Sequence, residues 1–116
     1  LLDGRSPEEY TGEKPGRTPT SPVGHIPGAL NLNSYSLVDE DGRFLDRNSE
    51  AFRKRFEQAG IDTDKPVVAY SAGGNRSSIL LFALSQAGVP ASHYIGGVGD
   101  WTREGKKDLV KGKNPK

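Results

Sequence analysis

The stretch PVVAYSAGGNRSS, residues 66–78, contains the residue types from which an anion-binding or catalytic loop is built. An apolar run ends at Tyr70, two glycines and an asparagine follow, and a second apolar run begins shortly after Arg76. Glycines let the backbone curl so that several N–H groups point inward, and the first turn of a following helix adds unpaired donors and its positive end. The stretch therefore predicts a site for an anion.

Ser71 stands at the first position of this loop, where a reactive side chain would lie among the inward-pointing donors. A cysteine there would ionise readily and act as a nucleophile, but the chain has no cysteine. The loop itself offers no obvious base for a serine hydroxyl. A plain strand-to-helix connection is the alternative for this loop taken alone. The residues expected to contribute to the site are Ser71, Ala72, Gly73, Gly74, Asn75 and Arg76.

Alternating strand and helix patterns predict the scaffold that positions the loop. Residues 65–70 form a continuous apolar run typical of a central parallel strand, and residues 77–88 indicate a buried helix closed by a glycine. This alternation predicts an α/β fold with a mostly parallel central sheet, helices on both faces and a ligand at the carboxyl ends of the strands. Shorter strands are expected at the start of the chain, where 1–3 is the tail of one, and, each with a turn, within 24–32 and 91–97. Helices are expected after Ser6 and from Asn48 or Ser49 to Gly60, and a short helix or turn at 98–105.

The composition of the 116 residues is that of one ordinary globular domain. We expect a single domain over 1–116, with a surface loop insertion at 11–23 and a basic tail at 106–116. A net charge of +1 argues against nucleic acid as the main partner, and no segment has the apolar length of a membrane span. Two histidines and no cysteine make a metal site unexpected, and no cofactor is predicted. The chain begins without methionine, as a trimmed domain or a processed piece would, so the sequence does not indicate its targeting. The location is left unknown, with a cytoplasmic one favoured.

Four ordered motifs resemble those of rhodanese-like sulfurtransferase domains, and the match runs over essentially the whole chain. The motifs are LLDGRSPEEY, GHIPGALNL, PVVAYSAGGNRSS and YIGGVGDW. More narrowly, the long insertion before Gly24, the DEDGRF segment, AGID and the lysine-rich tail are similar to the catalytic C-terminal half of two-domain thiosulfate and 3-mercaptopyruvate sulfurtransferases.

The resemblance implies a two-step sulfur transfer. A thiolate would take the outer sulfur of a small anionic donor, thiosulfate or 3-mercaptopyruvate, and pass it from a persulfide to cyanide or a thiol acceptor. The main-chain donors of residues 72–76 would stabilise the persulfide, and Arg5 and Arg76 would help to hold the donor. A second rhodanese-like domain is a further candidate partner. Related phosphatases with the same architecture use one more loop residue around a phosphate, so phosphatase activity is disfavoured.

Ser71 is the departure from the family pattern, because it stands where the family has its nucleophilic cysteine. A hydroxyl cannot carry a sulfane sulfur in that way, so we expect this chain to be inactive in sulfur transfer. Three explanations remain open: an engineered cysteine-to-serine change, a naturally silent rhodanese-like domain used for anion binding, regulation or interaction, and a rare serine-based hydrolysis.

Neither histidine is assigned a catalytic role from the sequence. His25 lies in the Gly-His-x-Pro-Gly turn, where a structural hydrogen bond is the favoured interpretation, and His93 is expected to be a strand residue without a role. Asp3 is expected to position Arg5 or the loop backbone rather than to act as an acid.

Overall fold

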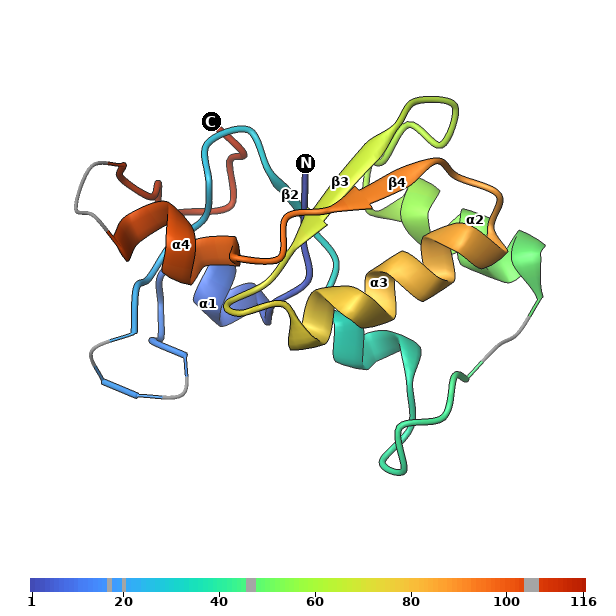
Figure 1. The fold of residues 1–116 in the computed structure, drawn as a ribbon, viewed down its shortest axis with the longest axis horizontal. Coiled ribbons are helices and arrows are strands. Elements are labelled where there is room, and N and C mark those ends of the chain that lie inside the picture. The colour runs from blue at the N-terminus through green and yellow to red at the C-terminus, as the bar shows by residue number, and fades with distance from the viewer. Residues whose placement is uncertain (17, 20, 46–47, 104–106) are drawn as a thin grey trace.

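The structure is a computed structural model that describes residues 1–16, 18–19, 21–45, 48–103 and 107–116. Strands and helices alternate along these residues, as the sequence pattern predicts (Figure 1). Their order is β1 (Leu2–Asp3), α1 (Pro7–Thr11), β2 (Leu30–Asn31), the 3-10 helix η1 (Ser34–Leu37), α2 (Ser49–Gln58), β3 (Val67–Tyr70), α3 (Asn75–Gln86), β4 (Ala91–His93) and α4 (Gly97–Arg103).

The four strands form one sheet in the order β2-β1-β3-β4, and all three pairings are parallel. Leu2 of β1 lies opposite Leu30 on one side and Ala69 on the other, and Ala69 lies opposite His93 of β4. The α/β class is confirmed, and its sheet is wholly rather than mostly parallel. The loops after β1 and β3 consequently leave the same end of the sheet.

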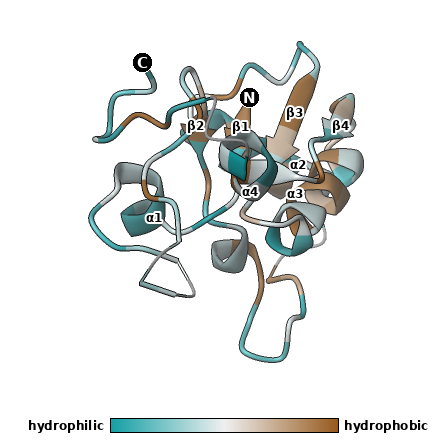
Figure 2. Cartoon of the chain, turned by 60° about the vertical axis from the view of Figure 1, so that its left-hand side comes forward, coloured by the Kyte–Doolittle hydropathy of each residue, from teal (hydrophilic) through white to brown (hydrophobic). Residues whose placement is uncertain are grey.

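Successive side chains of a strand point to opposite faces of the sheet, and the core is divided accordingly. Ala69 packs into a cluster with Phe52 and Phe56 of α2 and Leu80 of α3. Tyr70 packs on the other face with residues of and around α1 and α4, among them Tyr10, Ile26 and Val98. Helices therefore cover both faces of the sheet. Figure 2 shows most of β3 in the brown of hydrophobic residues.

Local signals explain where the helices begin and end. Ser6 caps α1 by accepting the N–H of Glu9 at 3.2 Å, and Pro7 occupies the first turn, where a missing N–H costs nothing. Asn48 caps α2 by accepting the N–H of Glu50 at 2.8 Å. Gly60 follows α2 in the left-handed conformation with φ +87°, as the sequence predicts.

The expected loop and tail have few regular elements of their own. Between the end of α1 and Val23, the described residues form only turns and bends, while Arg17 and Thr20 lie outside the described part. Lys106, at the start of the expected tail, also lies outside it. Val110 forms an isolated antiparallel bridge with His25, which ties the tail to the turn before β2. No helix in the described ranges is long and apolar enough to cross a membrane.

Candidate functional site

The loop between β3 and α3 has the form that its sequence predicts. Ser71 follows the last residue of β3 directly, and α3 begins at Asn75. Gly74 caps the helix with φ +105°, and a Cβ at this residue would lie 3.0 Å from the carbonyl oxygen of Ile95. This position thus requires glycine both for its backbone conformation and for the close approach of the segment after β4.

Ser71 lies at the centre of the loop with its side chain almost fully covered. Its Oγ accepts the N–H groups of Gly74 and Ser77, each at 3.2 Å, and lies 3.0 Å from the Oγ of Ser77. The loop therefore provides two main-chain donors and one hydroxyl to the atom at this position. Donors of this kind stabilise a negative charge, which is what a nucleophile needs as it loses its proton.

The other main-chain polar groups of the loop are of two kinds: carbonyl groups that bond to other described residues and N–H groups that do not. The carbonyl oxygens of Ser71 and Ala72 accept the N–H groups of Val98 and Gly99 at 3.0 and 3.1 Å. In the described part of the chain, by contrast, four loop N–H groups donate no hydrogen bond: those of Ala72, Gly73, Asn75 and Arg76. The carbonyl oxygens of Ser71 and Ala72 thus have hydrogen-bond partners within the protein, whereas the four N–H groups have none in the described ranges. The loop therefore suits a ligand that accepts hydrogen bonds.

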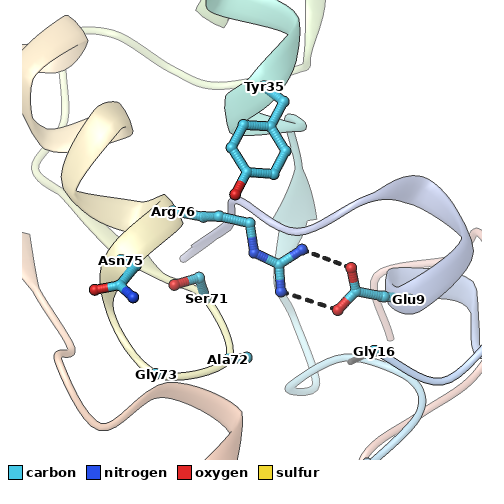
Figure 3. Close-up of a pocket in the computed structure, with 8 residues that line it drawn as sticks. All are labelled: Glu9, Gly16, Tyr35, Ser71, Ala72, Gly73, Asn75 and Arg76. Carbon is cyan, nitrogen blue, oxygen red and sulfur yellow. Dashed lines mark hydrogen bonds and ion pairs between the residues drawn. The ribbon is translucent and has the colours of Figure 1, made fainter. Parts of the chain in front are cut away.

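A pocket of about 440 Å³ opens over this loop. Figure 3 shows the side chain of Arg76 reaching from the start of α3 across the pocket to Glu9 of α1. Two hydrogen bonds join them, from Nη1 to Oε1 at 2.6 Å and from Nη2 to Oε2 at 3.0 Å. The residues that line the pocket are Glu9, Gly16, Tyr35, Ser71, Ala72, Gly73, Asn75 and Arg76.

Glu9 and Arg76 hold each other in their charged forms. Burial alone raises the pKa of Glu9, but the hydrogen bonds and the charge of Arg76 outweigh it, so the pKa of Glu9 lies below its usual value. The hydrogen bonds that Arg76 donates to the Glu9 carboxylate in turn raise the pKa of Arg76. Because they are the only charged side chains among the described lining residues and they pair with each other, the lining has almost no net charge.

The structure brings Ser71, Ala72, Gly73, Asn75 and Arg76 together at the pocket, but it does not bring Arg5 there. Arg5 is 1% exposed, and its guanidinium bonds to the carboxylate of Asp3 and to the carbonyl oxygen of Gly24. Its guanidinium is buried and directed to Asp3 and Gly24, and Arg5 is not among the residues that line the pocket. Asp3 holds Arg5, as expected, through both the main chain and the side chain.

The comparison with protein families shows which family the chain belongs to. The sequence model of the family described as "Rhodanese-like domain" matches residues 1–104. This chain belongs to the rhodanese-like domain family. Relatives of the domain include a "putative thiosulfate sulfurtransferase" of Haloferax volcanii, 41% identical over 90 residues, covering 74% of this chain and 31% of that protein. A protein of the same name from Saccharopolyspora erythraea is 34% identical, covering 99% of this chain and 42% of that protein.

Solved structures with the same fold are also similar to this rhodanese-like domain. The Tum1 protein of Saccharomyces cerevisiae has a TM-score of 0.81 and 28% identity, covering 97% of this chain and 40% of Tum1. EanB, in a structure described as a cysteine persulfide with ergothioneine, has a TM-score of 0.82 and 25% identity, covering 97% of this chain and 28% of EanB. The domain thus spans less than half the length of these relatives and neighbours.

Five residues at or beside the site were not assigned to it from the sequence: Glu9, Gly16, Tyr35, Ser77 and His93. Glu9 is one residue of a helix-capping pattern, and nothing local connects it with Arg76. Ser77 Oγ lies 2.5 Å from Nε2 of His93, the residue expected to have no role. The parallel alternation of β3, α3 and β4 offered the one usable signal, because it places the end of β4 beside the loop after β3. In the described residues, no group of three or more His, Cys, Asp or Glu side chains could hold a metal ion.

Proposed function

We propose that this domain is built for sulfane sulfur transfer and that Ser71 leaves the chain without that activity. The observation that carries the proposal is the position of Ser71 Oγ, which accepts two main-chain N–H groups in a loop with four further unpaired donors. A thiolate at this position would be stabilised by the same donors, whereas a serine hydroxyl is a poor acceptor of sulfur.

The proposed reaction for a thiol at position 71 has two steps. The thiolate attacks the outer sulfur of thiosulfate, so a new S–S bond forms, the old S–S bond breaks and sulfite leaves. The terminal sulfur then passes to cyanide as thiocyanate, or to a thiol acceptor, and the thiolate returns. Ala72, Gly73, Gly74 and Asn75 would contribute main-chain donors to the persulfide, and Arg76 would contact the anionic donor. Thiosulfate and 3-mercaptopyruvate are both proposed donors.

The test is thiocyanate production from thiosulfate and cyanide by the chain as it stands and by Ser71→Cys. We expect turnover only in Ser71→Cys. The matched control is Ser78→Cys, which introduces a thiol at an exposed serine of α3, the helix that follows the loop, and should not turn over. Activity of the unaltered chain, or equal activity of the two cysteine variants, would contradict the proposal.

A non-catalytic module that binds anions, or that regulates or contacts a partner, is the second candidate. It is favoured by the combination of unpaired loop donors with the absence of any thiol in the chain. Titration calorimetry with thiosulfate and sulfite separates the two functions. Binding to the unaltered chain, together with a folded but inactive Ser71→Cys, would support the module. A second rhodanese-like domain is a proposed partner, since the chain is shorter than its relatives.

A further inference from the structure

A chain of three side chains links the nucleophile position to a histidine. Ser71 Oγ lies 3.0 Å from Ser77 Oγ, which lies 2.5 Å from Nε2 of His93. Ser71 is 1% exposed and Ser77 is fully buried, so water does not compete at the centre of the chain. The sheet holds the third member, because His93 ends β4 opposite Ala69 of β3 and Tyr94 donates its N–H to the carbonyl of Ala69 at 3.0 Å.

The surrounding hydrogen bonds allow a proton to move along this chain. Ser77 has one hydroxyl proton and three neighbours within reach: Ser71 Oγ, His93 Nε2 and the carbonyl oxygen of Gly74 at 3.1 Å. The Gly74 carbonyl also accepts the N–H of Ser78 at 3.2 Å, so it keeps a donor when the Ser77 hydroxyl turns to His93. Ser71 can then donate to Ser77, and a neutral imidazole nitrogen is available to accept the proton of Ser77.

We infer that Ser71, Ser77 and His93 form a proton relay that makes Ser71 a hydroxyl nucleophile towards small carboxylic esters. Ser71 is the catalytic residue in this reaction, whereas Ser77 and His93 act through it. The relay supplies the base that the loop alone lacks, because it can accept the proton of the Ser71 hydroxyl. It needs no substitution in the chain. The inference is independent of sulfur transfer, which requires a thiol.

Two further observations fit attack on the carbonyl of a small uncharged ester. The unpaired N–H groups of Ala72, Gly73, Asn75 and Arg76 lie in the same loop as Ser71, where they can stabilise the oxyanion that forms when a carbonyl is attacked. Glu9 and Arg76, the only charged side chains among the described lining residues, pair with each other, so the lining has almost no net charge. A small uncharged ester therefore brings no unpaired charge into the pocket.

The reaction balances without an oxidant or a reductant. Ser71 Oγ bonds to the carbonyl carbon as its proton passes to Ser77 and the proton of Ser77 passes to His93. The ester C–O bond then breaks, and the leaving alcohol takes up the proton by the reverse route. Water attacks the acylated Ser71 in the same manner, which releases the acid and restores the hydroxyl. The sum is one ester and one water converted to one acid and one alcohol.

The probe is p-nitrophenyl acetate with the unaltered 116-residue chain, followed by release of nitrophenol and by mass spectrometry of the acetylated peptide. We expect acetylation at Ser71 and its loss in Ser71→Ala. His93→Gln should lower the rate by about 10²–10⁴-fold, the usual contribution of a general base. Glutamine can hydrogen-bond to Ser77 but cannot take its proton, so a merely structural histidine would be replaced without loss of rate.

Ser77→Ala should lower the rate as His93→Gln does, and Ser92→Ala, at an exposed residue of β4, should not. Thermal unfolding of each variant shows whether it is folded, and the glutamine variant keeps the test valid if Ser77→Ala is not. Three results would overturn the inference: no acetyl group on Ser71, full activity in His93→Gln, or full activity in Ser71→Ala. The last would mean that another nucleophile of the chain, such as a histidine or a lysine, attacks the ester directly.

Discussion

At the scale of single residues, the end of β1 depends on a buried polar network that includes Tyr70, the last residue before the Ser71 loop. Tyr70 donates its hydroxyl to Asp3 at 2.9 Å and accepts the N–H of Ile26 at 3.1 Å, while Asp3 also holds Arg5. Burial and the charge of Asp3 raise the pKa of Tyr70 far above its usual value, so the hydroxyl keeps its proton at any ordinary pH. Every member of the network has a partner, which is the condition under which buried polar groups are tolerated.

Tyr70→Phe should destabilise the domain by roughly 1–3 kcal/mol, because it leaves the N–H of Ile26 without a partner and Asp3 with one donor fewer. Urea unfolding at neutral pH measures the change. Tyr35→Phe is the matched control, since Tyr35 is 60% exposed and should be nearly neutral. Equal losses in the two variants would mean that the buried hydrogen bonds are not responsible.

The ion pair between Glu9 and Arg76 should make stability depend on pH. The pKa of Glu9 lies below its unfolded value near 4.5, so the charged form favours the folded state. This stabilisation is complete above pH 4.5 and is lost as the pH falls through the lowered pKa of the folded state. Glu9→Gln should cost roughly 1–3 kcal/mol at pH 7, because Arg76 loses its charged acceptor in a mostly buried site.

The measurement is urea unfolding of the unaltered chain and of Glu9→Gln from pH 7 to pH 3. The difference between them should be constant at first and then shrink below about pH 4.5. Glu57→Gln, on the exposed side of α2, should show neither the loss nor the change with pH. A difference that stays constant down to pH 3 would refute the role assigned to the charge of Glu9.

At the scale of elements, the start of α4 holds the loop between β3 and α3 through main-chain hydrogen bonds. Gly97 has φ +56°, and a Cβ there would lie 2.0 Å from the carbonyl oxygen of Ser71. The next two residues donate their N–H groups to the carbonyls of Ser71 and Ala72. The glycine pair after β4 therefore serves the loop after β3, because only a residue without a side chain allows the two segments to touch.

Gly97→Ala should be more destabilising than Gly42→Ala. Both residues have positive φ, so both variants carry a left-handed strain of about 1–2 kcal/mol, but a Cβ at Gly42 would meet nothing within 4 Å. The additional loss of unfolding free energy in Gly97→Ala, compared with Gly42→Ala, measures the cost of the clash with the loop. Chemical denaturation supplies both values, and equal losses would show that the loop and α4 separate at no cost.

At the scale of the whole molecule, the C-terminal tail returns to the turn that precedes β2. The ring nitrogens of His25 lie 2.9 Å from the carbonyl oxygen of Tyr10 and 3.1 Å from those of Asn114 and Pro115. The His25 ring is fully buried and stacks on the ring of Tyr10, with 3.8 Å between the two ring centroids. One side chain thus joins α1, the turn and the chain end, which agrees with the structural role expected for His25.

His25→Ala should release the tail while the sheet stays intact. Amide hydrogen exchange of Val110 and Gly112 should become roughly tenfold faster or more, since each hydrogen bond and the stacked ring contribute about 1 kcal/mol to holding the segment. The amides of β3 should be unchanged. His93→Ala, which removes the other histidine, should leave the tail protected. Faster exchange in β3 as well would mean that His25 supports the whole fold.

The strand, loop and helix around Ser71 and the class of the fold could be predicted from the amino-acid sequence alone. These features depend on local signals, namely an apolar run, glycines that permit a sharp turn and residues that cap helices, and such signals act over a few neighbouring positions. The four motifs carried the family resemblance for the same reason, because each is a short stretch with its own backbone requirement.

Which side chains meet at the site could not be predicted from the sequence and became visible in the tertiary structure. It joined Glu9 to Arg76 across the pocket, turned Arg5 inward to Asp3 and Gly24, and placed His93 beside Ser77. Glu9 is 67 residues from Arg76, and His93 is 16 residues from Ser77. Periodicity and spacing report the conformation and the face of each element, whereas contacts between charged or titratable side chains depend on how separate elements pack against one another.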